Sequence, residues 1–203
     1  MIEAVPSEEI QQQYDRHWHH RARTLGIPDR RVWASIHSSQ NTPALARMRR
    51  FLQHEFEDGR CLSLLGPTGV GKSYAAVAAL RWYAEDTSRG WFYYFPKLCA
   101  ELMDQDRREH ALGLVTTWSL VVFDDFGVEY LKSGGFLDAL IDEIIWTREG
   151  NTLATIITTN LTEEQLRDRL SDRIVDRLAG DWGSLYAVPG KSLRGQGRAK
   201  EER

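Results

Sequence analysis

The residues with the clearest chemical signature are 66–73, which read GPTGVGKS. A glycine, four further residues and then Gly-Lys-Ser form a pattern whose glycines allow tight turns, so that successive backbone N–H groups can point at one anion. A helix beginning near Gly71 would add the positive end of its dipole. Lys72 would then reach the β- and γ-phosphates of a nucleotide, and the Ser73 hydroxyl would bind Mg²⁺.

We therefore predict that this loop binds ATP together with Mg²⁺. The alternative is a glycine-rich turn without a ligand, but chance rarely places this pattern between an apolar strand and a helix. The predicted ATP-binding residues are Gly66, Pro67, Thr68, Gly69, Val70, Gly71, Lys72, Ser73 and Tyr74.

Two acidic residues end the apolar stretch SLVVFDD at 119–125. Asp124 would close a buried strand, where a carboxylate is costly unless a cation or hydrogen bonds satisfy it. We predict that Asp124 holds the water shell of Mg²⁺ and that Asp125 orients and activates the attacking water. Asp125 is one methylene shorter than the Glu that many such ATPases carry here, so hydrolysis could be slow. The alternative is a pair of acidic residues that only cap a strand.

Asn160 ends another apolar stretch, TLATIITTN at 152–160. If this strand lies between the strands that end at the loop and at Asp124, then Asn160 would point at the γ-phosphate and the attacking water. The alternative is an ordinary strand-ending Asn without a catalytic role.

Two arginines, Arg173 and Arg177, are four residues apart in SDRIVDRL and share one helix face. Neither is expected to reach the ATP of its own subunit, because their helix follows the fourth strand. In an oligomer one of them could enter the neighbouring site as an arginine finger that stabilises charge on the transferring phosphoryl group. The alternative is a pair of surface arginines bound to Asp172 and Asp176.

These side chains require a parallel α/β sheet that brings strand ends to one edge. Apolar strands are predicted at 61–65, 91–95, 119–125, 152–160 and 185–188. The periodicity predicts helices at 7–23, 42–56, 72–86, 97–108, 135–149 and 162–179. Helices alternating with near-continuous apolar strands indicate a five-stranded parallel sheet covered on both faces. We divide the chain into an N-terminal helical extension (1–57), a core (58–190) and a basic flexible tail (191–203).

The composition is that of an ordinary globular protein, with 42% hydrophobic and 27% charged residues. No apolar run is long enough to span a bilayer and the N-terminus lacks the apolar core of a signal peptide, so we expect a cytoplasmic protein without a membrane partner. Cys61 and Cys99 have no paired spacing and are expected to be buried free thiols. Residues 1–50 contain 8 Arg against 5 acidic residues, and 191–203 are also basic. These ends suit a polyanion or form a solvated basic face.

Four motifs together resemble one family. The Asp-Asp-Phe-Gly after the third strand, then TTN, then DRIVDRL, preceded by LGIPDR at 25–30, look like the DnaC/DnaI/IstB group of AAA+ ATPases, over roughly residues 25–194. The resemblance implies a P-loop AAA+ core without a sizeable C-terminal lid, self-association into rings or spirals, and ATP-dependent action on single-stranded DNA or a replicative helicase. It also favours Arg177 over Arg173 as the finger and offers Arg194 as a weak nucleotide sensor.

The resemblance supports a helicase-loader-like ATPase of DNA replication that oligomerises on DNA. Helix 7–23 would then bind the helicase, and the Gly-Ile-Pro at 26–28 would lead into the core, although only about 25 residues precede that tripeptide. Lys97, Arg107 and Arg108 are candidate DNA contacts or solvated helix charges. The alternative function is an IstB-like transposition helper that binds duplex DNA and recruits a transposase. A scaffold that binds ATP but hardly hydrolyses it is a third interpretation.

A histidine cluster at His17, His19 and His20 surrounds Trp18. Its spacing does not place the three histidines on one helix face, so we do not predict a metal site there. Trp18 could contact a partner or fold back onto the core, and the sequence does not choose between the two.

Overall fold

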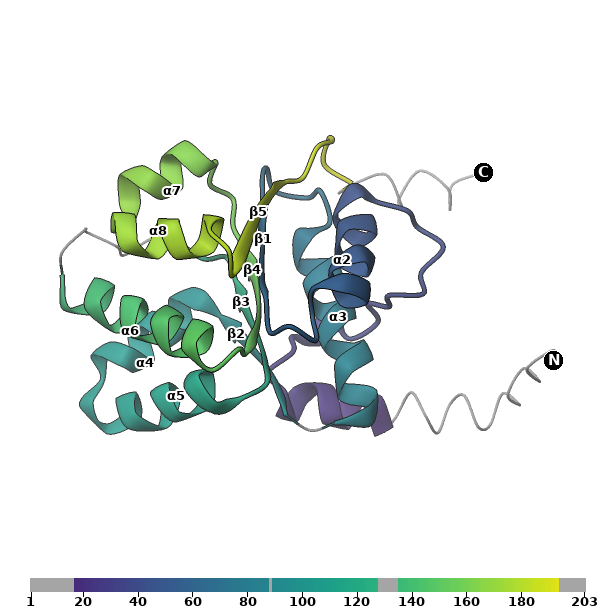
Figure 1. Ribbon diagram of the computed structural model, residues 1–203. Helices are drawn as coiled ribbons and strands as arrows, with labels where there is room; N and C mark the ends of the chain where they lie inside the picture. Colours follow the sequence, from purple (N-terminus) through teal and green to yellow (C-terminus); the bar gives the residue numbers. More distant parts are fainter. Residues whose placement is uncertain (1–16, 88, 128–134, 194–203) are drawn as a thin grey trace.

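A computed structural model of the chain describes residues 17–87, 89–127 and 135–193 (Figure 1). At the centre of this described part is one five-stranded parallel sheet with the order β2-β3-β4-β1-β5. The strands are β1 (Cys61–Leu65), β2 (Gly90–Tyr94), β3 (Leu120–Asp124), β4 (Ala154–Thr158) and β5 (Gly183–Ala187). The predicted fold class is confirmed, and β4 lies between β3 and β1 as the prediction for Asn160 required.

Helices cover both faces of the sheet, which explains why β1, β3 and β4 are buried along their whole length. Figure 1 shows α2 and α3 on one face, and α4 to α8 on the other. The first group is α2 (Pro43–His54) and α3 (Lys72–Asp86), and the helical residues 17–24 lie on the same face of the sheet. The second group is α4 (Phe95–Met103), α5 (Gln105–Thr117), α6 (Phe136–Gly150), α7 (Glu163–Arg169) and α8 (Asp172–Ala179).

The start of α2 follows from local chemistry. The Thr42 hydroxyl accepts a hydrogen bond from the backbone N–H of Leu45 at 3.2 Å, and Pro43 occupies the first helical position. Leu45, Met48 and Phe51 are fully buried in the core that α2 and α3 share with the sheet. The helix was predicted at 42–56, and it ends at His54, two residues earlier than expected.

Two predicted helices are each divided in two. The helix expected at 97–108 breaks at Asp104, whose backbone is extended and whose side chain accepts a hydrogen bond from the N–H of Asp106 at 3.0 Å. Asp104 thus ends α4 and caps α5. The helix expected at 162–179 breaks at Leu170, which is extended and buried between α7 and α8. Both single-helix predictions were wrong. The apolar period continues across Leu170, whereas at Asp104 the local side-chain cap ends one helix and starts the next.

The N-terminal segment packs against the sheet. Trp18 is buried, and its indole N–H donates to the carbonyl of Val32 at 2.7 Å, so this side chain folds back onto the core. Pro28 precedes the 3₁₀ helix η1 (Asp29–Arg31). The backbone N–H of Phe92 in β2 donates to the carbonyl of Leu25 at 2.8 Å, which attaches the segment to the edge strand. Residues 7–16 of the expected first helix lie outside the described residues.

Cys61 and Cys99 are both buried free thiols, as predicted, and burial raises the pKa of each to about 12. None of the helices in the described ranges is both long and apolar enough to cross a membrane. His19 contacts the ring of Trp33 at 4.4 Å between centroids.

Candidate functional site

The loop 66–71 joins β1 to α3 at the carboxyl edge of the sheet. Gly69 and Gly71 have φ values of 88° and 95°, a region that side chains with a Cβ rarely adopt. A Cβ on Gly69 would also lie 2.1 Å from the Ser192 hydroxyl. Gly71 is the residue before α3, so the loop turns directly into the helix N-terminus. This geometry leaves the loop's backbone close to any group bound at the end of the helix.

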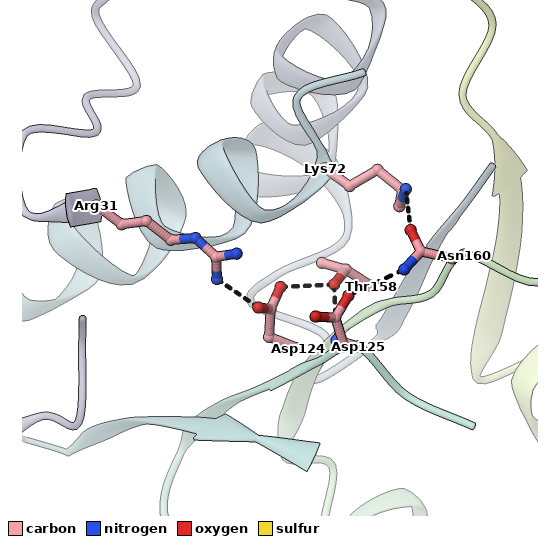
Figure 2. Close-up of polar contacts among 6 residues, drawn as sticks. All are labelled: Arg31, Lys72, Asp124, Asp125, Thr158 and Asn160. Atoms are coloured by element: carbon pink, nitrogen blue, oxygen red, sulfur yellow. Dashed lines mark hydrogen bonds and ion pairs between the residues drawn. The ribbon is translucent and has the colours of Figure 1, made fainter. Parts of the chain in front are cut away.

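Lys72 is buried and lies across this loop. Its ammonium donates to the carbonyl oxygens of Gly66 at 2.6 Å and Pro67 at 2.7 Å, and to the Asn160 side-chain oxygen at 3.0 Å. Figure 2 shows the contact between Lys72 and Asn160. Because β4 is adjacent to β1, the residue that follows β4 reaches the lysine that follows β1.

The two carboxylates lie on the other side of Asn160 (Figure 2). Asp124 is fully buried at the end of β3, and the Thr158 hydroxyl donates to its Oδ1 at 2.7 Å. The guanidinium of Arg31 pairs with Asp124 Oδ2. Asp125 has a left-handed backbone (φ 59°), its N–H donates to the Thr158 hydroxyl at 3.2 Å, and the Asn160 amide donates to its carboxylate at 3.3 Å. Thr158 therefore fixes both acids at once.

The surroundings of Asp125 shift the pKa of its carboxyl group. Burial, and then the neighbouring charge of Asp124, raise the pKa of Asp125; the charges of Arg31 and Lys72 and the hydrogen bond from Asn160 oppose this rise. A raised pKa makes the carboxylate of Asp125 a better proton acceptor than an ordinary surface aspartate.

A cavity of about 490 Å³ opens in front of these groups. Its volume is in the range of small-molecule sites. The lining comes from three parts of the chain: the N-terminal segment, the loop with α3, and the strand ends. The residues are Arg30, Arg31, Gln40, Thr42, Leu45, Thr68, Gly69, Gly71, Lys72, Ser73, Tyr74, Asp125, Asn160 and Leu193.

The predicted site residues are brought together to different degrees. Thr68, Gly69, Gly71, Lys72, Ser73, Tyr74, Asp125 and Asn160 line the cavity. Gly66 and Pro67 contribute the carbonyls that hold Lys72, and Val70 is buried. Asp124 is fully buried and does not line the cavity, but it pairs with Arg31, which does. Arg194 lies outside the described residues.

Arg30 and Arg31 were missed by the sequence reasoning. Arg31 is 93 residues from its partner Asp124. The available signal was their position beside the LGIPDR motif, which includes Arg30 and is followed at once by Arg31. No periodicity or spacing rule links such a segment to a strand end.

The finger candidates lie away from the cavity. Arg177 pairs with Glu149 at 2.8 Å and Asp142 at 3.2 Å, both on α6. Arg173 is exposed. The alternative that Arg177 pairs with Asp172 and Asp176 is wrong, because the contacts run to a helix that is distant in sequence.

The candidate DNA contacts all have partners within the chain. Lys97 lies 3.6 Å from Glu101, and Arg107 lies 3.6 Å from Asp104. Arg108 donates to the carbonyl of Leu102 at 2.7 Å. Lys97 and Arg107 remain largely exposed, so these weak helix pairs leave their charges accessible.

The donors at the strand ends also fit Mg²⁺, which prefers oxygen ligands and nucleotide phosphates. The Ser73 hydroxyl lines the cavity, and the Asp124 and Asp125 carboxylates end β3. The glycine loop beside them has the close-approach backbone that a phosphate requires.

Comparisons with known proteins agree with this geometry. A family model described as "IstB-like ATP binding protein" matches residues 1–201. The replicative helicase loader DnaI of Bacillus subtilis (strain 168) is 29% identical over 116 residues, which are 56% of this chain and 37% of DnaI. The chain thus spans little more than a third of the curated relative that it matches.

Two solved structures are similar in fold. The crystal structure of the DnaC helicase loader is 29% identical with a TM-score of 0.67, and the match covers 80% of this chain and all of the other. A crystal structure of DnaI gives a TM-score of 0.70 at 24% identity, covering 86% of this chain and all of the other; at that identity the likeness shows the fold alone. With its P-loop fold, its strand-end polar groups and a family match over almost its whole length, the chain belongs to the family of IstB-like ATP binding proteins.

Proposed function

We propose that the chain is an ATPase that binds ATP with Mg²⁺ in the 490 Å³ cavity and acts in DNA replication as a helicase-loader-like factor. One observation carries the ATP site. Lys72, Asn160 and Asp125 form a continuous hydrogen-bonded row beside the glycine loop, from the helix N-terminus to the end of β3. Such a row has the cation, amide and carboxylate that triphosphate hydrolysis needs at one edge of a sheet.

Each residue has a distinct role in this proposal. Ser73 and Asp124 would hold Mg²⁺, which neutralises phosphate charge. Lys72 turns its ammonium from the loop carbonyls to phosphate oxygens, where a charged donor binds more strongly. Asp125 accepts the proton of the attacking water, and Asn160 orients the Asp125 carboxylate through their 3.3 Å hydrogen bond.

Arg177 is the proposed finger that acts on the site of a neighbouring copy. Its two partners on α6 hold the guanidinium in a half-buried position on the surface of its own subunit. Surface pairs of this kind are worth about 1 kcal/mol or less each, so a phosphate of the neighbour could replace them. The role requires self-association into a ring or spiral, which we include in the proposal.

The partners follow from the relatives and from exposed charge. The named relatives are helicase loaders, so we propose a replicative helicase and single-stranded DNA as partners. Lys97 and Arg107 on α4 and α5 are the proposed DNA contacts. A second candidate is a transposition helper that binds duplex DNA and recruits a transposase; the IstB-like family match over residues 1–201 favours it.

The ATP site is tested by calorimetry with ATPγS and Mg²⁺. Lys72→Ala is expected to weaken binding by about 100-fold, because a charge-assisted contact to phosphate is lost. The matched control is Arg167→Ala, which removes a cation from the exposed surface of α7. Unchanged affinity of Lys72→Ala, or no heat with the wild-type protein, would refute the proposed site.

The partner proposal is tested by gel filtration of the wild-type protein with ATPγS–Mg²⁺ and a replicative helicase, with single-stranded or duplex DNA added separately. Co-elution with helicase and preference for single strands support the loader. Preference for duplex DNA without helicase binding supports the transposition helper instead.

A further inference from the structure

Arg31 neutralises a carboxylate that is otherwise buried without a counter-charge. Its guanidinium pairs with Asp124 Oδ2, and the two side chains are 15% and 0% exposed. A buried ionised carboxylate is strongly destabilising unless a cation and hydrogen bonds satisfy it. Thr158 supplies the hydrogen bond to Oδ1, so Arg31 and Thr158 together occupy both oxygens of Asp124 (Figure 2).

The same carboxylate is the proposed ligand of the Mg²⁺ shell. The Oδ1 atom is held from within the sheet by Thr158, which leaves Oδ2 as the oxygen that faces a second cation. Two cations that share one buried oxygen repel each other strongly in a low-dielectric site. Mg²⁺ and the Arg31 guanidinium therefore compete for one position.

An alternative location for the displaced guanidinium lies nearby. Arg31 and its neighbour Arg30 both line the cavity that Lys72 and Ser73 also line. A guanidinium that leaves Asp124 can stay in the same open cavity. The exchange thus moves the arginine away from the carboxylate and leaves its side chain without that anchor.

We propose that Arg31 and nucleotide-bound Mg²⁺ occupy Asp124 in turn, and that the η1 turn of the N-terminal segment shifts when they exchange. This inference rests on the proposed function, because it requires the nucleotide and Mg²⁺ to bind in this cavity. In this proposal, the contact between Arg31 and Asp124 depends on whether Mg²⁺ is bound beside Asp124.

The N-terminal segment is built to respond to such a shift. The backbone N–H groups of Arg31, Val32 and Ala34 each close a short turn, to the carbonyls of Pro28, Asp29 and Arg31. The ring of Phe92 lies 6.0 Å from the Arg31 guanidinium carbon, and Trp18 is bonded to Val32. We expect loss of the anchor at Asp124 to loosen these short turns, because their hydrogen bonds lie outside the α-helices and strands.

The first experiment measures how much Mg²⁺ strengthens nucleotide binding. Calorimetry gives the dissociation constant of ATPγS in EDTA and in excess Mg²⁺, and the ratio of the two is compared between proteins. Arg31→Gln removes the competing charge and is expected to raise this ratio by about tenfold or more. The matched control is Arg23→Gln, whose exposed side chain pairs with Asp29 and does not line the cavity; it is expected to keep the wild-type ratio.

A second measurement uses only the wild-type protein, so it does not depend on the stability of a variant. Hydrogen exchange of the amides in residues 29–36 is followed with ATPγS in EDTA and with ATPγS in excess Mg²⁺. We expect faster exchange with Mg²⁺, because Arg31 has left Asp124.

The outcomes separate the inference from the function on which it rests. If ATPγS binds but Arg31→Gln keeps the wild-type ratio, or if Mg²⁺ leaves the exchange of residues 29–36 unchanged, the exchange at Asp124 is refuted while the nucleotide site stands. If ATPγS binds under neither condition, the proposed function and the inference are both refuted.

Discussion

Two arginines lie at opposite ends of the parallel strands, and their guanidinium groups bind different kinds of partner. Arg148, at the amino end of β4, donates to the carbonyls of Val115, Trp118 and Ala154 and to the Thr155 hydroxyl, over 2.6–3.1 Å. Arg31, at the carboxyl end of β3, pairs with the Asp124 carboxylate. The first arginine is fixed by neutral groups on three parts of the chain, whereas the second is held by a charge.

This difference distinguishes the amino ends of the strands, where Arg148 stabilises the fold, from the carboxyl ends, where the candidate site lies. Neutral carbonyls carry no net charge for an incoming cation to neutralise, so these contacts of Arg148 serve to hold the end of α5 to β4. Burial lowers the pKa of Arg148 to about 9, which still leaves it protonated at neutral pH. A carboxylate partner can exchange one cation for another, which makes the carboxyl edge the one that can respond to a ligand.

The comparison is tested most strongly by replacing Arg148, the arginine at the amino ends of the strands. Arg148→Met keeps much of the volume but leaves several buried carbonyls without donors. We expect a loss of about 3 kcal/mol or more in the free energy of unfolding, measured by urea denaturation. Arg167→Met, on the exposed surface of α7, is the control and should change stability by less than about 0.5 kcal/mol. A loss no larger than that of the control would contradict the structural role.

At the carboxyl ends of the strands, the corresponding change is Thr158→Val. It removes the donor to Asp124 Oδ1 and the acceptor for the Asp125 N–H while keeping the side-chain shape. We expect a loss of about 2 kcal/mol in the free energy of unfolding, because two buried polar groups lose a partner. The control is Thr117→Val, whose hydroxyl bonds within exposed α5. Equal effects of the two substitutions would show that Thr158 does not organise the acids.

Arg177 offers a third arginine whose partners are charged but only half-buried. Arg177→Ala should lower the free energy of unfolding by less than about 1 kcal/mol, because its two ion pairs are near the surface. Nucleotide binding should be unchanged, and the hydrolysis stimulated by self-association should be lost. Arg167→Ala, which also removes an arginine with two acidic partners, is the control. Retention of that stimulated hydrolysis in Arg177→Ala would exclude the finger role.

The smallest expected effect concerns pH. The pKa of Asp125 is raised in the folded chain, first by burial and then by Asp124. The ionised carboxylate therefore costs stability, and this cost is absent below the ordinary pKa of about 4 and grows as the pH rises through the folded value. Asp125→Asn should thus be more stable than wild type at pH 7, by about 0.5 kcal/mol after solvent screening, and equal to it at pH 3. A stability gain that is largest at low pH would reverse this sign.

Much of the architecture could be predicted because local signals and global packing agree. The five apolar strands and the helix that begins after Thr42 appear close to where the sequence indicated them. The predicted position of Asn160 depended on the strand order, and that order has β4 between β3 and β1.

The parts that sequence reasoning missed depend on contacts between distant residues. Arg31 reaches Asp124 across 93 positions, and Arg177 binds α6 rather than its neighbours on α8. The break at Leu170 interrupts a pattern that remains helical by periodicity, whereas the break at Asp104 comes from a local side-chain cap that the prediction overlooked. The contacts of Arg31 and Arg177 are decided by tertiary packing, which a local period cannot report.

The close approach of Gly26 to β2 has a consequence for assembly. Gly26 has a φ of 80°, and a Cβ there would lie 2.4 Å from the Phe92 carbonyl oxygen. This close approach and the hydrogen bond from the Phe92 N–H to the Leu25 carbonyl place residues 25 and 26 along the outer side of β2, an edge strand of the sheet. An uncovered edge strand can pair with strands of other molecules and so promotes aggregation. With its outer side covered in this way, β2 is less able to pair with a strand of another molecule.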